Sequence, residues 1–281
     1  MNATVSLLEY SFAAICCILS IYFTVATLIS KTVAKLWNDC PALALFFLNL
    51  LLNAAVEILF SLEWIFVGLT GSTEEWVPVL HHSGVVSSAV RWFYDCATLG
   101  IFIQRVLHLT FPAFSPISLN RVILSLDFVL PTFLTGYLAY LNHLNDISDI
   151  SFNPDCHSFN CLGTYKGLLK LYSFYGEVVL SCLIVTVGSV LELLVHQKKW
   201  RSRTQNKNKL NRFAKYVFCL RVVFEMVPFL ADTILFHLTG RSLGCYIGAY
   251  GAVGGSLEMF VCSLAYFWMT RLRHESRVPP S

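Results

Sequence analysis

Seven long apolar segments constrain this chain more than any other feature of its sequence. Each is long enough for an α-helix to cross the roughly 30 Å hydrocarbon core of a bilayer, which takes about 20 residues. A helix also satisfies its own backbone hydrogen bonds, as that core requires. The sequence therefore predicts an all-α membrane protein, a seven-transmembrane helix bundle formed by one domain over residues 1–281. The segments are predicted at 7–30, 42–69, 84–108, 122–142, 167–196, 215–238 and 245–269.

The composition excludes an ordinary soluble protein. Hydrophobic residues make up 56% of the chain and charged residues only 13%, against about 25% charged in soluble domains. The basic residues gather in one loop and do not form a face of a folded domain, so a nucleic-acid partner is not expected. The lipid bilayer is the expected environment, and the chain is expected to be integral and multi-pass.

The distribution of positive charge predicts the orientation. Fifteen of the 20 Lys and Arg residues fall between alternate segments on one side or after the last segment, eight of them between residues 198 and 215. Cytoplasmic loops carry such an excess. We therefore expect the N-terminus outside and the C-terminus in the cytoplasm, which also agrees with the odd number of segments.

The loops on the expected outer side contain two further features. Asn2 begins the only N-glycosylation sequon, Asn2-Ala3-Thr4. Cys156 and Cys161 lie in the loop before the fifth segment, and Cys245 lies near the outer end of the seventh. An oxidising compartment permits a disulfide among these three cysteines, and the sequence leaves the pairing open.

Polar residues recur at helical spacing inside three segments. A charge at mid-bilayer costs about 2.5–3.5 kcal/mol, so these side chains should face the bundle interior and pair with one another. Arg91 with Asp95, and Arg221 with Glu225, are spaced to neutralise each other within their own helices. The simpler alternative is polar contact between helices, worth roughly 0.6–2 kcal/mol each. The residues expected in this polar bundle core are Asn49, Asn53, Glu57, Arg221, Glu225 and Glu258.

Three classes of function compete for such a chain. A membrane hydrolase needs convergent metal ligands, but none of the eight histidines forms an HxxxH or HxxxD pair within a segment, so no enzyme, metal or cofactor is expected. A transporter or channel could use the intramembrane acids, although no internal repeat is evident. A receptor fits the basic cytoplasmic surface, and Pro228 would bend the sixth segment.

The third segment carries a resemblance to G-protein-coupled receptors. Gln104-Arg105-Val106 lies at its cytoplasmic end, with Pro112 seven residues after the arginine. This spacing is similar to the D/E-R-Y arginine and loop proline of rhodopsin-like receptors, although the acid and the tyrosine are absent. The N-P-x-x-Y motif is also absent. With its short length, the chain resembles the nematode chemoreceptors, in particular the serpentine receptor class beta-like (Srbc) group.

That resemblance implies a chemosensory receptor in the plasma membrane of a sensory cilium. The implied partners are a small-molecule or pheromone ligand outside and a heterotrimeric G protein inside. From depth and polarity, the candidate ligand-binding residues are Arg91, Trp92, Asp95, Tyr172, Tyr175, Glu177, Asp232 and His237. The candidate residues for G-protein coupling are Arg105, Pro112, Lys198, Lys199, Arg201 and Arg203.

Overall fold

The computed structural model describes residues 3–30, 36–37, 40–71, 73–111, 116–144, 167–201, 209–239 and 243–275. These residues are almost entirely helical, and none of them lies in a strand, so the predicted all-α class is confirmed for this part of the chain. The long helices are α1 (Ala3–Ser30), α3 (Pro41–Thr70), α4 (Thr73–Thr110), α5 (Pro116–Leu144), α6 (Gly167–Arg201) and α10 (Tyr250–Glu275).

One further long helical segment is uninterrupted but consists of three parts. It comprises α7 (Lys209–Arg221), the π-helical segment η3 (Val222–Met226) and α8 (Val227–Thr239), and we call it the α7–η3–α8 rod. A single short turn, α9 (Gly244–Ile247), precedes α10.

Five of the described helices are long and apolar enough to cross a membrane. They are α1, α3, α5, α6 and α10, through the stretches Thr4–Ile29, Pro41–Thr70, Leu119–Leu144, Tyr175–Gln197 and Tyr250–Arg271. Helix α4 and the α7–η3–α8 rod carry charged residues in their middles, Arg91 and Asp95 in the former and Arg221 and Glu225 in the latter. These features are those of an all-α membrane protein.

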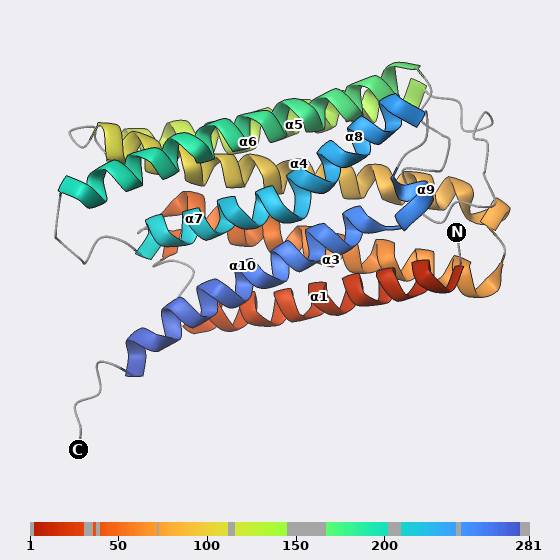
Figure 1. Cartoon of the computed structure of the whole chain (residues 1–281), viewed down its shortest axis with the longest axis horizontal. Coiled ribbons are helices and arrows are strands. Elements are labelled where there is room, and N and C mark those ends of the chain that lie inside the picture. The colour runs from red at the N-terminus through yellow and green to blue at the C-terminus, as the bar shows by residue number, and fades with distance from the viewer. Residues whose placement is uncertain are drawn as a thin grey trace.

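The long helices run in alternating directions and form one bundle (Figure 1). Helix α1 packs against both α3 and α10, so the first and last long helices are neighbours. Helix α4 contacts α3, α5, α6 and α7, which makes it the central element of the bundle. A group on α4 can therefore reach most of the other helices.

The two ends of the bundle differ in charge. The end at which the chain leaves α10 also holds the end of α4 and the start of α7 (Figure 1). We call it the basic end, because Arg105, Arg121, Arg212, Lys215 and Arg271 lie there. The N-terminus of α1 lies at the opposite end.

Helix α3 shows how local sequence sets the helix boundaries. Pro41 occupies its first turn, where the missing N–H removes no hydrogen bond. The helix stops at Gly71, whose φ of 70° is left-handed and whose N–H donates to Val67 O at 3.0 Å. Glycine adopts this backbone conformation without a Cβ penalty.

Two helices differ in extent from the predicted segments. The helix that contains 84–108 begins at Thr73, eleven residues earlier, because Val77 and Leu80 in this polar stretch pack against Tyr10 and Trp64. The segment predicted at 245–269 is interrupted by Gly248, which has a φ of 89°, and α10 begins after it. The hydrophobicity of the sequence alone did not predict that the stretch before residue 84 has a buried face, or that the helix is interrupted at Gly248.

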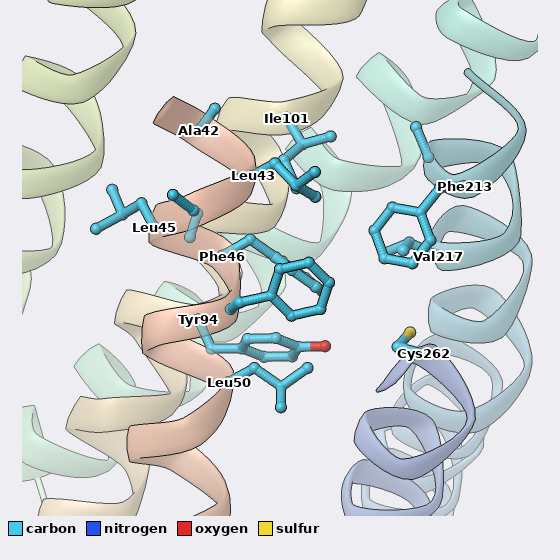
Figure 2. Close-up of a cluster of buried hydrophobic side chains, with 14 of the residues drawn as sticks. Ala42, Leu43, Leu45, Phe46, Leu50, Tyr94, Ile101, Phe213, Val217 and Cys262 are labelled. Carbon is cyan, nitrogen blue, oxygen red and sulfur yellow. The ribbon is translucent and has the colours of Figure 1, made fainter. Parts of the chain in front are cut away.

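An aromatic layer fills the bundle between its middle and the basic end (Figure 2). We call Phe46, Phe47, Phe102, Phe213 and Tyr266 the apolar layer, since all are buried. The Phe47 and Tyr266 ring centroids are 4.7 Å apart, and those of Phe213 and Tyr266 are 4.9 Å apart. The layer joins α3, α4, α7 and α10 through apolar contacts.

The π-helix η3 lies directly before Pro228 and faces a glycine of α10. Val227 N–H donates to Val222 O across the wider turn, and Pro228 has no N–H for Phe224 O, its partner in a regular α-helix. A Cβ on Gly254 would overlap the Phe224 carbonyl oxygen. The bulge and the glycine thus let the α7–η3–α8 rod approach α10 closely.

We expect Gly254→Ala to destabilise the protein by about 1–3 kcal/mol, as overpacking does. The obstacle is a backbone carbonyl, which cannot move aside as a side chain can. The gain in helix propensity, at most about 1 kcal/mol, is smaller. Thermal unfolding of the detergent-solubilised protein measures the difference.

The matched control is Gly251→Ala, on the same helix, where a Cβ meets no atom within 4 Å. We expect this variant to be at least as stable as the parent. Equal stability of the two variants would contradict the close approach at Gly254.

Candidate functional site

A buried arginine at the end of α7 links three helices. Arg221 is 2% exposed, and its Nη1 lies 2.5 Å from Asp95 Oδ1 on α4. Its Nε lies 3.0 Å from Glu258 Oε1 on α10, and it also forms an ion pair with Glu225 in η3. We call Arg221, Asp95, Glu225 and Glu258 the Arg221 cluster.

Two α4 side chains complete the surroundings of this arginine. The Tyr94 hydroxyl donates to Glu258 Oε1 at 3.1 Å, and the guanidinium lies over the Tyr94 ring at 4.6 Å from its centroid. Arg221 Nη2 donates to Thr98 Oγ1 at 3.4 Å. Figure 2 shows the Tyr94 ring beside Phe46, with its hydroxyl pointing away from α4. The cluster therefore lies next to the apolar layer.

The pairing differs from the one expected within single helices. Arg221 and Glu225 do pair, as their spacing predicted. Asp95, however, is paired with Arg221 across the helix interface instead of with Arg91 on its own helix. The rotation of α4 turns Asp95 toward α7, and spacing along one helix cannot report that rotation.

Arg91 lies one turn from Asp95, beside α10. Its Nη2 donates to Gly251 O at 3.3 Å, and a Cβ on Gly255 would overlap the guanidinium. The acidic side chains whose charges act on it include Glu57 of α3 and Glu177 of α6. Arg91 thus has carboxyl groups of several helices around it.

The polar residues of α3 are buried on one side of the helix. Asn49, Asn53 and Glu57 are 8%, 3% and 5% exposed. Asn53 Nδ2 donates to Met259 Sδ at 3.3 Å, and Glu57 Oε2 accepts from Ser87 of α4 at 3.1 Å. This face therefore connects α3 to α4 and α10.

Two of the aromatic ligand-binding candidates lie in a separate contact. Trp92 is fully buried against Leu138 and Leu180 of α5 and α6, and its ring is 5.7 Å from that of Tyr172. Tyr172 donates its hydroxyl hydrogen to Leu134 O at 3.1 Å. Both side chains hold α4, α5 and α6 together, away from the Arg221 cluster.

The remaining ligand-binding candidates are dispersed. Tyr175 is 57% exposed and His237 is exposed, each on the outside of its helix. Asp232 accepts a hydrogen bond from Leu243 N–H and so positions the chain before α9. The structure brings Arg91, Asp95 and Glu177 into one electrostatic environment, and it does not add Tyr175 or His237 to that group.

Gln104 and Arg105 form a second polar contact at the basic end. The Cys40 thiol, beside the start of α3, donates to Gln104 Oε1 at 3.1 Å. Gln104 Nε2 donates to Asn120 Oδ1 of α5 at 2.7 Å, and Arg105 Nη2 donates to Cys40 Sγ at 3.4 Å. Gln104 thereby ties α4 to both neighbours.

Several predicted site residues lie outside the described part of the chain. These are Asn2, Pro112, Cys156, Cys161 and Arg203, together with the side chains of Lys198, Lys199, Arg201 and Cys245. Among the described residues, no group of three or more His, Cys, Asp or Glu side chains could hold a metal ion.

Some of the residues that build the site could not be predicted from the sequence. Tyr94, Cys40 and Gly254 belong to no motif in the sequence and acquire their roles only from neighbouring helices.

No protein-family model matches the sequence, and no curated protein matches it either.

Proposed function

We propose that the chain is a seven-transmembrane chemosensory receptor of the nematode serpentine type. Its ligand is a small molecule or pheromone that binds between the helices on the side of the N-terminus, which faces outward. Its basic end faces the cytoplasm and activates a heterotrimeric G protein, and its location is the plasma membrane of a sensory cilium.

The observation that carries this proposal is the position of the Arg221 cluster. It connects α4, the α7–η3–α8 rod and α10 at the irregular turn before Pro228. A π-helical turn and a proline are places where a helix bends and shifts. A ligand that displaced one of these helices would change ion pairs on all three, and the movement would reach the basic end.

The bundle also supports seven passes. Helix α4 and the α7–η3–α8 rod are less apolar than the other long helices. Their charged residues Asp95 and Arg221 face the interior of the bundle, where both are buried. Charge that faces neighbouring helices does not prevent a helix from crossing a bilayer. Insertion of a tag at either terminus and its accessibility in intact cells would test the orientation.

A small-molecule screen in cells that report G-protein activation tests receptor function directly. With any active compound, we expect Arg91→Ala to raise the half-maximal concentration about 10- to 100-fold, because a hydrogen bond to a charged group is worth about 1.5–3 kcal/mol. Surface labelling must show equal expression. An unchanged dose–response curve would remove Arg91 from the ligand site.

Coupling is tested separately at the basic end. We expect Arg105→Ala to lose most ligand-evoked G-protein activation while ligand binding persists. Arg121→Ala, which removes an exposed arginine from the same end, is the matched control and should signal normally. Normal signalling by Arg105→Ala at the cell surface would contradict a coupling role.

A transporter or channel that uses intramembrane acids is the second candidate. The carboxyl groups of Glu57, Asp95, Glu177 and Glu258 in the bundle interior favour it. The apolar layer weighs against it, since five aromatic side chains fill the interior between the cluster and the basic end. Ligand-dependent current or uptake in cells without G proteins would support the transporter and refute the receptor.

A further inference from the structure

The Arg221 cluster contains more acid than base. One guanidinium contacts three carboxyl groups, those of Asp95, Glu225 and Glu258. Asp95 and Glu258 are 5% and 1% exposed. Buried charges must be paired, because leaving an ion uncompensated in a low-dielectric interior costs several kcal/mol. A single positive charge cannot compensate three negative ones.

Two of these carboxyl groups share one guanidinium. Glu225 pairs with Arg221 Nη1 and Glu258 pairs with Arg221 Nε. Carboxyl groups that share a site do not all ionise, because like charges at close range disfavour the charged form, so one of them holds a proton.

The contacts of Glu258 indicate which oxygen carries the proton. Its Oε1 accepts from the Tyr94 hydroxyl and faces Arg221 Nε. Neither contact uses Oε2, which is therefore the oxygen available to hold a hydrogen.

A second observation indicates that Arg221 does not supply hydrogen bonds to all the buried carboxyl oxygens of the cluster. Asp95 Oδ1 is buried and has no hydrogen-bond partner among the described residues, although it lies close to Arg221. The contact is an ion pair without hydrogen-bond alignment. An aligned, fully paired cluster would leave no such atom.

Residues around the Arg221 cluster do not compensate its excess of carboxyl groups. Arg91 acts on Glu225 and Asp95, but it also lies among Glu57 and Glu177, so the second arginine brings further acids with it. Among the described residues, Tyr94 and Cys262 also lie near Glu258, and neither a phenol nor a thiol can supply a positive charge.

From this geometry we infer that the Arg221 cluster is a proton-binding site. Glu258 holds the proton on Oε2. When α4, the α7–η3–α8 rod and α10 separate enough to admit water, the proton passes to water and Glu258 ionises. The equilibrium between the packed and the separated bundle is therefore linked to pH, whether the protein is a receptor or a transporter.

Infrared spectroscopy of the purified protein in lipid nanodiscs tests for the proton. The wild type should show a carboxylic acid C=O band at neutral pH. Glu258→Gln should lose this band, because an amide carries no titratable proton. Glu225→Gln should lose it as well, since one acid fewer around Arg221 lets Glu258 ionise.

Thermal or denaturant unfolding against pH tests the linkage. The packed protein binds one proton more than the unfolded chain above the ordinary pKa range of glutamate, so its stability should fall as the pH rises. While the packed state keeps the proton, one extra proton changes the unfolding equilibrium about tenfold for each pH unit. Glu258→Gln should abolish this component. The matched control, Glu192→Gln, is the same chemical change at a partly exposed position of α6 and should keep it.

Each contrary result overturns the inference. A C=O band that persists in both Glu258→Gln and Glu225→Gln would place the proton elsewhere. A pH slope unchanged by Glu258→Gln would show that no proton of this cluster is linked to packing. A stability loss at high pH that sodium chloride, but not choline chloride, reverses would assign the compensating charge to a metal cation.

Discussion

Arg221→Ala is expected to leave little folded protein. The substitution removes the one guanidinium that contacts Asp95, Glu225 and Glu258. Removing one partner of a buried ionic group costs about 3–5 kcal/mol, a large part of the 5–15 kcal/mol that stabilises a typical protein. Size-exclusion chromatography of detergent extracts should show loss of the monodisperse species, and residual protein should unfold at a lower temperature.

Two further variants separate electrostatics from a general effect of the substitution. Arg212→Ala removes an exposed arginine from the same helix and should be nearly neutral. Combining Arg221→Ala with Asp95→Asn lowers the uncompensated negative charge and should restore part of the stability. Wild-type behaviour of Arg221→Ala alone would mean that its ion pairs contribute nothing to the bundle.

Trp92→Ala is expected to destabilise the protein by about 3–5 kcal/mol, the range for a buried tryptophan. The side chain is fully buried against Leu138 and Leu180, and Gly176 of α6 lies against its ring, where a Cβ would be 3.1 Å from it. No ligand is needed for this effect. At about 2–4 °C per kcal/mol, the midpoint of thermal unfolding should fall by roughly 10 °C.

Trp268→Ala is the control, since Trp268 of α10 is 57% exposed and its loss should change stability little. Trp92→Phe should retain much of the packing and fall between the two. A Trp92→Ala protein with wild-type stability and no ligand response would instead assign Trp92 to ligand binding alone.

Local patterns in the sequence predicted what depends on one helix at a time. The spacing of Asn49, Asn53 and Glu57 placed them on one face of α3, and four residues separate Arg221 from Glu225. Helical periodicity is a property of the segment itself, so it can be read without neighbours. The helical class of the described residues follows for the same reason.

Helical periodicity within single segments did not predict the contacts between helices. Asp95 pairs with Arg221, more than 100 positions away, because of how α4 and α7 are rotated about their axes. Trp92 and Tyr172, expected at a ligand, pack against each other between helices. The π-helix at Val222–Met226 has only Pro228 as a sequence signal, and a proline predicts a bend without predicting an additional residue in the turn.

The length of α4 has a consequence for how the protein meets its surroundings. Its 38 residues make a helix of about 57 Å at 1.5 Å per residue, nearly twice the hydrocarbon thickness of a bilayer. In the orientation proposed above, the turns that begin at Thr73 extend past the outer edge of the hydrocarbon. A small molecule that approaches from that side would meet these turns, where Val77 packs with Tyr10 and Trp64 of α1 and α3, before it reached the charged interior.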